Sequence, residues 1–140
     1  MKTLRVRWKR LVHNNQTCPR CESTGEELEK AISILKEITA PLGIQVVLEK
    51  DELPIEAFHE NPLESNRIWI NGREIEEWLS GKVGSSPCCD VCGPHNCRTI
   101  QVDGKTYETI TSDIIVKAGI IAALSLTSKS CCVGDTGDQG

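Results

Sequence analysis

The chain has 140 residues, a length that suits one domain. Charged residues make up 26% and apolar residues 39%, as in ordinary globular proteins, and the net charge of −4 argues against nucleic acid as a partner. The longest apolar stretch, 113–126, is interrupted by Lys117 and is too short to span a bilayer, which argues against a membrane partner.

The first half of the chain predicts alternating strands and helices. Apolar and basic side chains alternate from Leu4 to Lys9, which is the period of a strand with one apolar and one basic face. Farther on, apolar residues recur at helical spacing until Pro41 ends the pattern. Asn71-Gly72 then closes a later strand with a strong turn signal. The predicted elements are a strand around 4–9, a helix over about 19–40, a strand over 44–48, a short helix within 53–62, a strand over 67–70, and a short strand or helical turn over 73–79.

The composition changes in the second half of the chain. Residues 80–97 are rich in Gly, Ser, Pro and Cys, so we expect a cysteine-rich loop inserted into the fold. Residues 98–110 predict a hairpin across an Asp-Gly turn, and 111–126 predict a closing helix. We therefore expect one domain over 1–127, which contains the inserted loop, and a disordered tail over 128–140.

Eight cysteines are a high count for a chain of this length. The basic N-terminus has no apolar run behind it and is no secretory signal, so we expect the protein in the reducing cytoplasm. Clustered cysteines in that compartment serve redox chemistry or metal binding more often than structural bridges. The two clusters here are CPRC at 18–21 and CCDVCGPHNC at 88–97.

The first cluster, Cys18-Pro19-Arg20-Cys21, comes at the start of the first predicted helix. Proline is favoured at the first helical position, so a helix that begins at Pro19 places Cys18 at its positive end, where a thiolate is stabilised. Arg20 adds a nearby cation. Cys18 would then be the attacking thiolate, and Cys21, one turn on, would resolve the mixed disulfide.

Three alternatives stay open for this pair. Residues 23–27 match a capping box, and a helix that begins only at Thr24 would lose most of the dipole stabilisation. CPRC also matches half of a four-cysteine zinc site, with Cys89 and Cys92 as the other half, although the halves lie much farther apart than the roughly 15–20 residues of zinc ribbons. Finally, both cysteines could be small structural core residues.

The order of elements and two motifs resemble the thioredoxin-like superfamily, glutaredoxin branch. The motifs are TCPRC after the first strand and RIWINGREI, which is similar to the third strand and turn of glutaredoxins. The resemblance covers about residues 1–79 and, more loosely, the final helix. It implies an α/β fold with a mixed sheet of about four strands, flanking helices and a Cys-rich loop insertion, together with thiol–disulfide oxidoreductase activity. It also suggests a small uncharacterised family whose members carry the extra insert.

The sequence departs from that superfamily at three places. Thioredoxin-like proteins have a cis-proline before the third strand, facing the redox pair, and Asn66 holds that place here. That proline shapes the substrate groove and keeps metal from the pair, so an asparagine favours metal binding and leaves substrate handling open. Thr17 stands where many members have an aromatic residue, and the cysteine-rich insert is foreign to the basic fold.

The second cluster brings more than four candidate ligands into one short segment. Four soft ligands are enough for tetrahedral zinc or another thiophilic metal. Alternatively, the cluster is a second dithiol that exchanges electrons with the CPRC pair, or a structural disulfide such as Cys92–Cys97 that fastens the loop. The candidate residues of this second site are Cys88, Cys89, Cys92, His95 and Cys97.

The sequence therefore predicts thiol–disulfide exchange through CPRC, with relay to the second cluster. This chemistry needs no cofactor, and its partner would be a protein or a low-molecular-weight dithiol or disulfide. The alternative is a non-enzymatic binding module for zinc, copper or arsenic that uses the Cys88–Cys97 loop. We expect at least one insert cysteine within about 10 Å of Cys18, and Cys131 and Cys132 are candidate further thiols.

The basic face of the first strand has two interpretations. Its cations could bind an anionic thiol or partner, or they could pair across strands with acids such as Glu49. We favour the cross-strand pairing with Glu49 and the acids near it.

Overall fold

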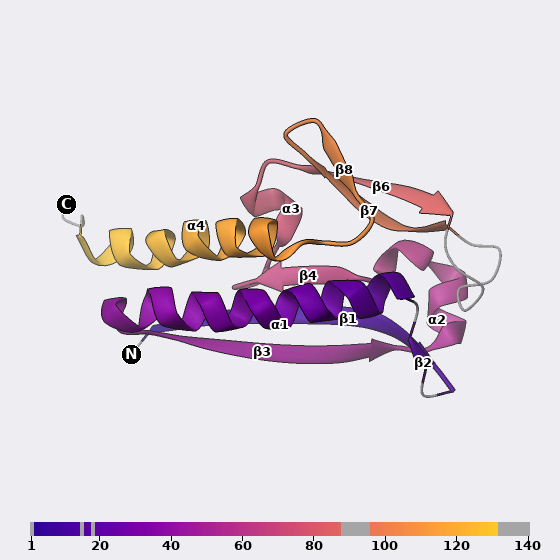
Figure 1. Ribbon diagram of the computed structural model, residues 1–140, viewed down its shortest axis with the longest axis horizontal. Helices are drawn as coiled ribbons and strands as arrows, with labels where there is room; N and C mark the ends of the chain where they lie inside the picture. The colour runs from indigo at the N-terminus through magenta and orange to yellow at the C-terminus, as the bar shows by residue number, and fades with distance from the viewer. Residues whose placement is uncertain (1, 15, 18, 88–95, 132–140) are drawn as a thin grey trace.

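The structure is a computed structural model that describes residues 2–14, 16–17, 19–87 and 96–131, with 16–17 and 128–131 described by their backbone alone (Figure 1). Two sheets and a layer of helices make up the fold.

The central sheet is built around the long N-terminal strand β1 (Lys2–His13). Strand β3 (Ile44–Leu53) runs parallel along one edge of β1, and β4 (Arg67–Ile70) pairs antiparallel with the other edge. β5 (Arg73–Glu74) pairs with β4, and the short β2 (Gln16–Thr17) pairs with the far end of β1. The order β3-β1-β4-β5 confirms the predicted mixed sheet of about four strands.

Two long helices, α1 (Pro19–Thr39) and α4 (Ser112–Cys131), lie side by side on one face of this sheet (Figure 1). α1 connects the parallel strands β1 and β3, as a crossover between parallel strands must. It continues into the turn η1 (Ala40–Leu42) and ends at Gly43, whose φ of 70° lies in the left-handed region that glycine adopts without strain. The helix predicted over 19–40 is confirmed.

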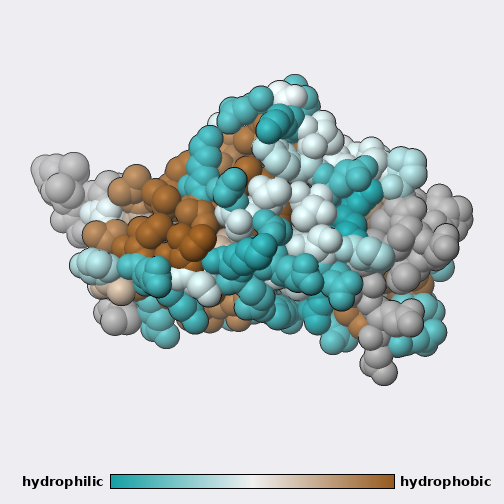
Figure 2. Space-filling model, in the orientation of Figure 1, coloured by the Kyte–Doolittle hydropathy of each residue, from teal (hydrophilic) through white to brown (hydrophobic). Residues whose placement is uncertain are grey.

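The closing helix is longer than the sequence predicts. A disordered tail was expected from residue 128, but α4 continues to Cys131. No glycine or proline occurs between residues 120 and 133, so nothing in the sequence stops the helix there. Figure 2 shows apolar surface gathered over α4, where Leu124 is exposed.

No helix in the described part of the chain is long and apolar enough to cross a membrane.

Short elements connect β3 to the second half of the chain. Helix α2 (Ile55–Glu60) occurs as predicted and is followed by the turn η2 (Pro62–Glu64). After β4, Asn71 and Gly72 form the predicted turn, with φ angles of 51° and 83°. The segment 73–79 contains both of its predicted alternatives, β5 and then the one-turn helix α3 (Ile75–Trp78).

A second, three-stranded antiparallel sheet contains β6 (Lys82–Pro87), β7 (Asn96–Val102) and β8 (Lys105–Tyr107). The hairpin across Asp103-Gly104 was predicted, whereas β6 was expected to be part of a loop over 80–97. That expectation is wrong for 82–87, because all six residues pair in register with β7. Strand propensity is weak in KVGSSP, so pairing with the mostly buried β7 decides its conformation.

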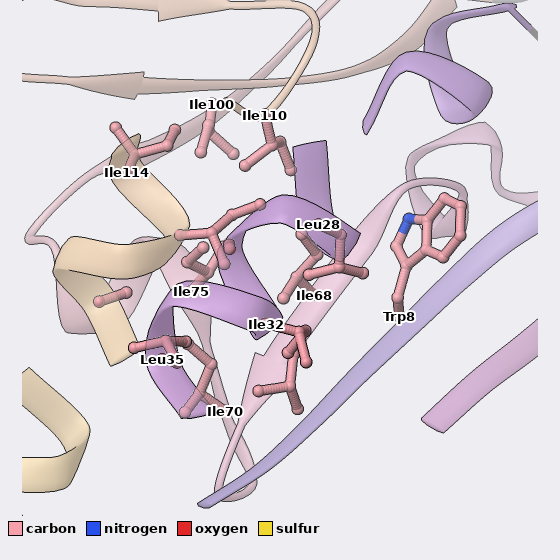
Figure 3. Close-up of a cluster of buried hydrophobic side chains, with 14 of the residues drawn as sticks. Trp8, Leu28, Ile32, Leu35, Ile68, Ile70, Ile75, Ile100, Ile110 and Ile114 are labelled. Atoms are coloured by element: carbon pink, nitrogen blue, oxygen red, sulfur yellow. The ribbon is translucent and has the colours of Figure 1, made fainter. Parts of the chain in front are cut away.

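Aliphatic side chains fill the core between the sheets and the helices (Figure 3). Aromatic residues are only 4% of the chain, so isoleucine and leucine supply most of this volume. The labelled members come from strands of both sheets, from α1, α3 and α4, and from the segment before α4; they are Trp8, Leu28, Ile32, Leu35, Ile68, Ile70, Ile75, Ile100, Ile110 and Ile114.

A buried ion-pair cluster fastens β7 to the central sheet. Arg98 donates from Nη2 to Glu76 Oε2 at 2.5 Å and to Glu74 Oε1 at 3.2 Å, and from Nη1 to the carbonyl of Leu63 at 2.6 Å. The Arg98 and Glu76 side chains are each only 7% exposed. Loss of Arg98 would therefore leave the Glu76 charge buried without this cation, whereas loss of Glu76 would leave Arg98 paired with Glu74.

Candidate redox site

The CPRC motif meets the start of α1, which begins at Pro19. Cys18 lies outside the described residues, and its sequence position is directly before the first helical residue. Cys21 lies in the first turn of α1, and its side chain faces the core with the residue only 2% exposed. The early helix start is confirmed, and the alternative start at Thr24 is wrong.

Asn66 lies behind the motif, directly before β4, and is buried with 1% exposure. Its φ of 62° is left-handed, a conformation that asparagine tolerates better than most residues. The side chain accepts a hydrogen bond from Trp8 Nε1 at 3.0 Å and donates from Nδ2 to Thr24 Oγ1 at 3.1 Å. Asn66 thereby ties β1 and β4 to the second turn of α1.

Polar side chains spaced four and three residues apart form a stripe along one side of α1. This polar stripe consists of Arg20, Thr24 and Glu27. The Thr24 hydroxyl oxygen also accepts from the Ile110 amide at 3.1 Å, and Glu27 Oε1 accepts from the Ser112 amide at 2.8 Å. The stripe therefore fixes the segment that leads into α4.

The Ser112 amide affects the titration of Glu27 as well. Its hydrogen bond, followed by that of Lys30, lowers the pKa of Glu27 below the usual 4.5. In the sequence, Thr24 and Glu27 matched only a capping box for α1. Their long-range partners, Asn66 and the amides of Ile110 and Ser112, lie far along the chain, and no local signal could identify them.

Arg20 joins the motif to the end of β6. Its Nη2 donates to the carbonyl of Pro87 at 2.8 Å and lies 3.5 Å from Glu108 Oε2. Glu108 in turn accepts from the hydroxyl of Ser86 at 2.9 Å. The Arg20 side chain is only 9% exposed, and within the described part of the chain its Nη1 is buried without a hydrogen-bond partner. These contacts fix the guanidinium of Arg20, which stands between Cys18 and Cys21 in the sequence.

The same contact brings the start of the cysteine-rich segment to the motif. Pro87 is the residue before Cys88 in the sequence. Cys97, on β7, pairs with Ser86 at the same end of the β6–β7 ribbon; it is 1% exposed and its sulfur is part of a disulfide bond. A sulfur in a disulfide is no metal ligand, so a metal site that uses Cys97 would require that bond to be reduced.

Several predicted site residues fall where the structure describes nothing or only the backbone. The predicted 10 Å approach to Cys18 and the Cys92–Cys97 bridge therefore stay predictions. Thr17 is part of β2 and Cys131 ends α4, with side chains undescribed. Figure 1 shows the C-terminal end of α4 at the opposite end of the molecule from the start of α1. The residues outside the description are Cys18, Cys88, Cys89, Cys92, His95 and Cys132.

The basic face of β1 is neutralised by acids, as the cross-strand interpretation predicts. Arg5 Nη1 lies 3.0 Å from Glu49 Oε2, and Arg7 Nε lies 2.6 Å from Asp51 Oδ2. A surface depression of about 310 Å³ adjoins Arg5, Arg7, Glu49 and Trp69, on the sheet face that points away from α1. Among the side chains that the structure describes, no three of His, Cys, Asp or Glu come together as metal ligands.

Comparison with known sequences adds the family. The sequence pattern of the family described as Domain of unknown function (DUF2703) matches residues 4–119. This chain belongs to the DUF2703 family. The DUF2703 chain is also 46% identical over 112 residues to an Archaeoglobus fulgidus protein named "Uncharacterized protein", over 80% of this chain and 82% of that protein. No solved structure matches the chain.

Proposed function

We propose that this DUF2703 protein carries out thiol–disulfide exchange through Cys18 and Cys21 in a thioredoxin-like fold. The strand order β3-β1-β4-β5 supports the fold, as does the helix α1 between parallel strands. The observation that carries the activity is the start of α1 at Pro19. It gives Cys18 the position before a helix of 21 residues, where the helix dipole favours a thiolate.

The reaction uses the two sulfurs in turn. The Cys18 thiolate attacks one sulfur of a partner disulfide; a Cys18–partner bond forms, the partner's S–S bond breaks, and the departing sulfur leaves as a thiolate that takes a proton from water. The Cys21 thiolate then attacks the Cys18 sulfur and releases the second partner thiolate. Two electrons pass to the partner, which becomes a dithiol, and a second dithiol must reduce the Cys18–Cys21 bond again.

The surroundings of CPRC support this division of roles. Cys21 is buried, so an external disulfide would have to meet Cys18 first. Arg20 is fixed by Pro87 and Glu108, which keeps its positive charge at the motif instead of in solvent. The partner would be a protein or a small dithiol or disulfide in the cytoplasm, and the exchange itself needs no cofactor.

Relay to the second cluster belongs to the same proposal. The contact from Arg20 to Pro87 brings the entry of the segment 88–95 to the motif, and Cys97 is held at the same end of β7. The reduced CPRC pair would then pass two electrons to a disulfide among Cys88, Cys89, Cys92 and Cys97, which would become a dithiol as the Cys18–Cys21 bond forms.

Selective chemistry on the two cysteines tests the activity. Iodoacetamide at about pH 6 should label Cys18 ahead of Cys21, because only a thiolate reacts and Cys18 is the sulfur at the helix start. Cys18→Ser should abolish reduction of a disulfide substrate, and Cys21→Ser should accumulate the mixed disulfide on Cys18. Cys132→Ser is the control and should behave as the unaltered protein. Equal labelling of both cysteines with no trapped species would exclude the proposal.

Binding of zinc, copper or arsenic is the second candidate. The contact between Arg20 and Pro87 also favours it, because ligands from both clusters begin at one place. Asn66 lies directly before β4, and in the thioredoxin-like fold proposed here it would hold the position at which a proline keeps metal from the pair. Mass spectrometry for metals, on protein purified anaerobically under reducing conditions, separates the candidates: a stoichiometric metal supports the binding module, and none supports redox exchange.

A further inference from the structure

Strand β6 forms an open edge of the second sheet. It pairs with β7 along one side for its whole length, from Lys82 to Pro87. No strand of the described chain pairs with its other side. An unpaired strand edge presents a row of backbone donors and acceptors on which another chain can build.

Pro87 establishes which residues of β6 face outward. In an antiparallel pair, residues alternate between those that bond the neighbouring strand through both backbone groups and those that bond it through neither. Pro87 has no N–H to give to β7, and its carbonyl accepts from Arg20 instead, so it belongs to the outward set. Counting back by twos, Ser85 and Val83 also direct their N–H and C=O groups outward. In the described part of the chain, no turn or loop backbone bond involves these groups of Val83 and Ser85, and the Pro87 carbonyl accepts from Arg20.

The open part of this edge carries none of the usual protection. Natural edge strands are guarded by charges, prolines or bulges. Here Lys82 and Pro87 stand only at the two ends, and the four residues between them are uncharged. Val83, Gly84 and Ser85 are all exposed. The edge can therefore pair with an added strand along the residues between Lys82 and Pro87.

The edge also points to the redox motif. It ends at Pro87, which is bonded to Arg20, one residue from Cys21 in the sequence. An extended segment advances about 3.3 Å per residue. A segment paired with Val83 and Ser85 would thus bring its next residues to the motif within two or three positions.

We propose that the outer edge of β6 binds an extended, cysteine-bearing segment of a redox partner protein as a fourth strand of the second sheet. This rests on the proposed exchange at Cys18, and the added strand delivers the partner's cysteine to it. A second copy of this chain is the rival occupant. It is the poorer choice, because its own β6 contains no cysteine and would cover the approach to the motif without supplying a substrate.

Amide hydrogen exchange with a synthetic strand tests the docking without any redox chemistry. The probe is the peptide acetyl-KTVTSTVTK-amide, in which serine replaces the reactive cysteine. In the unaltered full-length protein, the outward amides of Val83 and Ser85 should exchange fast, and the peptide should slow them at least tenfold. The amides of Gly84 and Ser86 face β7 and are protected throughout, so they are internal controls.

Substitution at Ser85 separates backbone recognition from side-chain effects. Ser85→Pro removes an outward N–H that takes no part in the β6–β7 ladder, so it should keep the sheet and abolish the peptide effect. Ser85→Ala keeps the N–H and should bind as the unaltered protein does. Val83→Pro is a second blocking variant, and retained Gly84 and Ser86 protection shows that either variant is folded.

The outcomes are distinct for docking and for exchange. If about 2 mM peptide does not slow exchange of the Val83 and Ser85 amides, the docking is overturned, because a useful transient complex has a Kd well below that concentration. Protection of Val83 and Ser85 that rises with protein concentration alone also overturns it, since the occupant is then a second copy. The cysteine version of the peptide, offered as a disulfide to Cys21→Ser, reports exchange: protection without a trapped Cys18 adduct supports the docking and rejects the proposed activity.

Discussion

Gly25 of α1 lies against the indole of Trp8, and a methyl group added there tests how rigidly the site is built. A Cβ at Gly25 would lie 2.7 Å from Trp8 Cη2 and 3.2 Å from Cζ3. The indole cannot move aside easily, because it is buried and its Nε1 donates to Asn66 at 3.0 Å. Gly25→Ala should therefore strain the contact between α1 and β1 directly behind the motif.

Two opposing effects set the magnitude. Alanine is better than glycine in a helix interior by about 1 kcal/mol. Carbon atoms pack at about 3.5–4.0 Å, so the new contact must open by about 1 Å. Overpacking of this kind costs about 1–3 kcal/mol, and the buried, hydrogen-bonded indole places this contact in the upper half of that range. After the gain of about 1 kcal/mol in helix propensity, the net loss of unfolding free energy should be about 1–2 kcal/mol. For a chain of this size that is a fall in Tm of roughly 3–6 °C.

Gly119→Ala is the matched control. Its Cβ would also come close to a neighbour, at 2.6 Å from Leu35 Cδ1. That neighbour is the end of a flexible side chain, whose adjustment costs about 1 kcal/mol, close to the gain in helix propensity. We expect a change in unfolding free energy near zero for Gly119→Ala.

Thermal unfolding followed by circular dichroism compares the two variants. In a double-mutant cycle, Trp8→Phe should relieve most of the Gly25→Ala penalty, because the smaller ring leaves room for the methyl group. An increase in Tm for Gly25→Ala, or additive effects of Gly25→Ala and Trp8→Phe, would refute the claim that a fixed indole limits this contact.

Three further predictions concern hydrogen-bonded polar side chains. Thr24→Val should lower the unfolding free energy by about 2–4 kcal/mol in urea titrations, because it leaves the Asn66 and Ile110 donors unpaired, and Thr24→Ser, which keeps the oxygen, should cost much less. Arg98→Met should cost about 3–5 kcal/mol by the same measurement, because Glu76 stays buried without its cation, and adding Glu76→Gln should recover part of the loss if the ion pair matters. The lowered pKa of Glu27 predicts stabilisation that is complete above pH 4.5 and is lost as pH falls through the folded-state pKa, so the Tm advantage over Glu27→Gln should shrink in that acid range and stay constant from pH 6 to pH 8.

The spacing of apolar residues was enough to predict the elements that turn one apolar face towards the core. The alternation in β1 and the helical spacing in α1 each place an apolar face on the core, and the Asn71-Gly72 turn needs the positive φ angles that these residues tolerate. The same logic gave the first residue of α1, since Pro19 suits the first helical position. These are local preferences that tertiary contacts did not override.

The elements that complete the site depend on contacts that no local pattern encodes. β6 has glycine and serine where strands prefer β-branched residues, and it is a strand because β7 pairs with it. Arg98 and Glu76 are residue types that are usually exposed, and only the packing of the two sheets buries them together. Asn66 could be assigned its position from the sequence, but its bonds to Trp8 and Thr24 could not.

The hydrogen bonds of Thr24 and Arg20 also determine which part of the fold could move in response to a change at CPRC. The second turn of α1 is held at Thr24 by Asn66 and by the Ile110 amide, so that turn cannot shift without breaking buried hydrogen bonds. If a disulfide formed within CPRC, the residues before Thr24 would have to move to accommodate it. Arg20 is among these residues, and it is hydrogen-bonded to the end of β6. If the proposed exchange takes place, the contact from Arg20 to Pro87 would couple it to the end of β6, while Thr24 and Asn66 hold the second turn of α1. Under that proposal, the strand edge that would receive a partner is bonded to the motif itself, so oxidation of the motif would be expected to change partner binding.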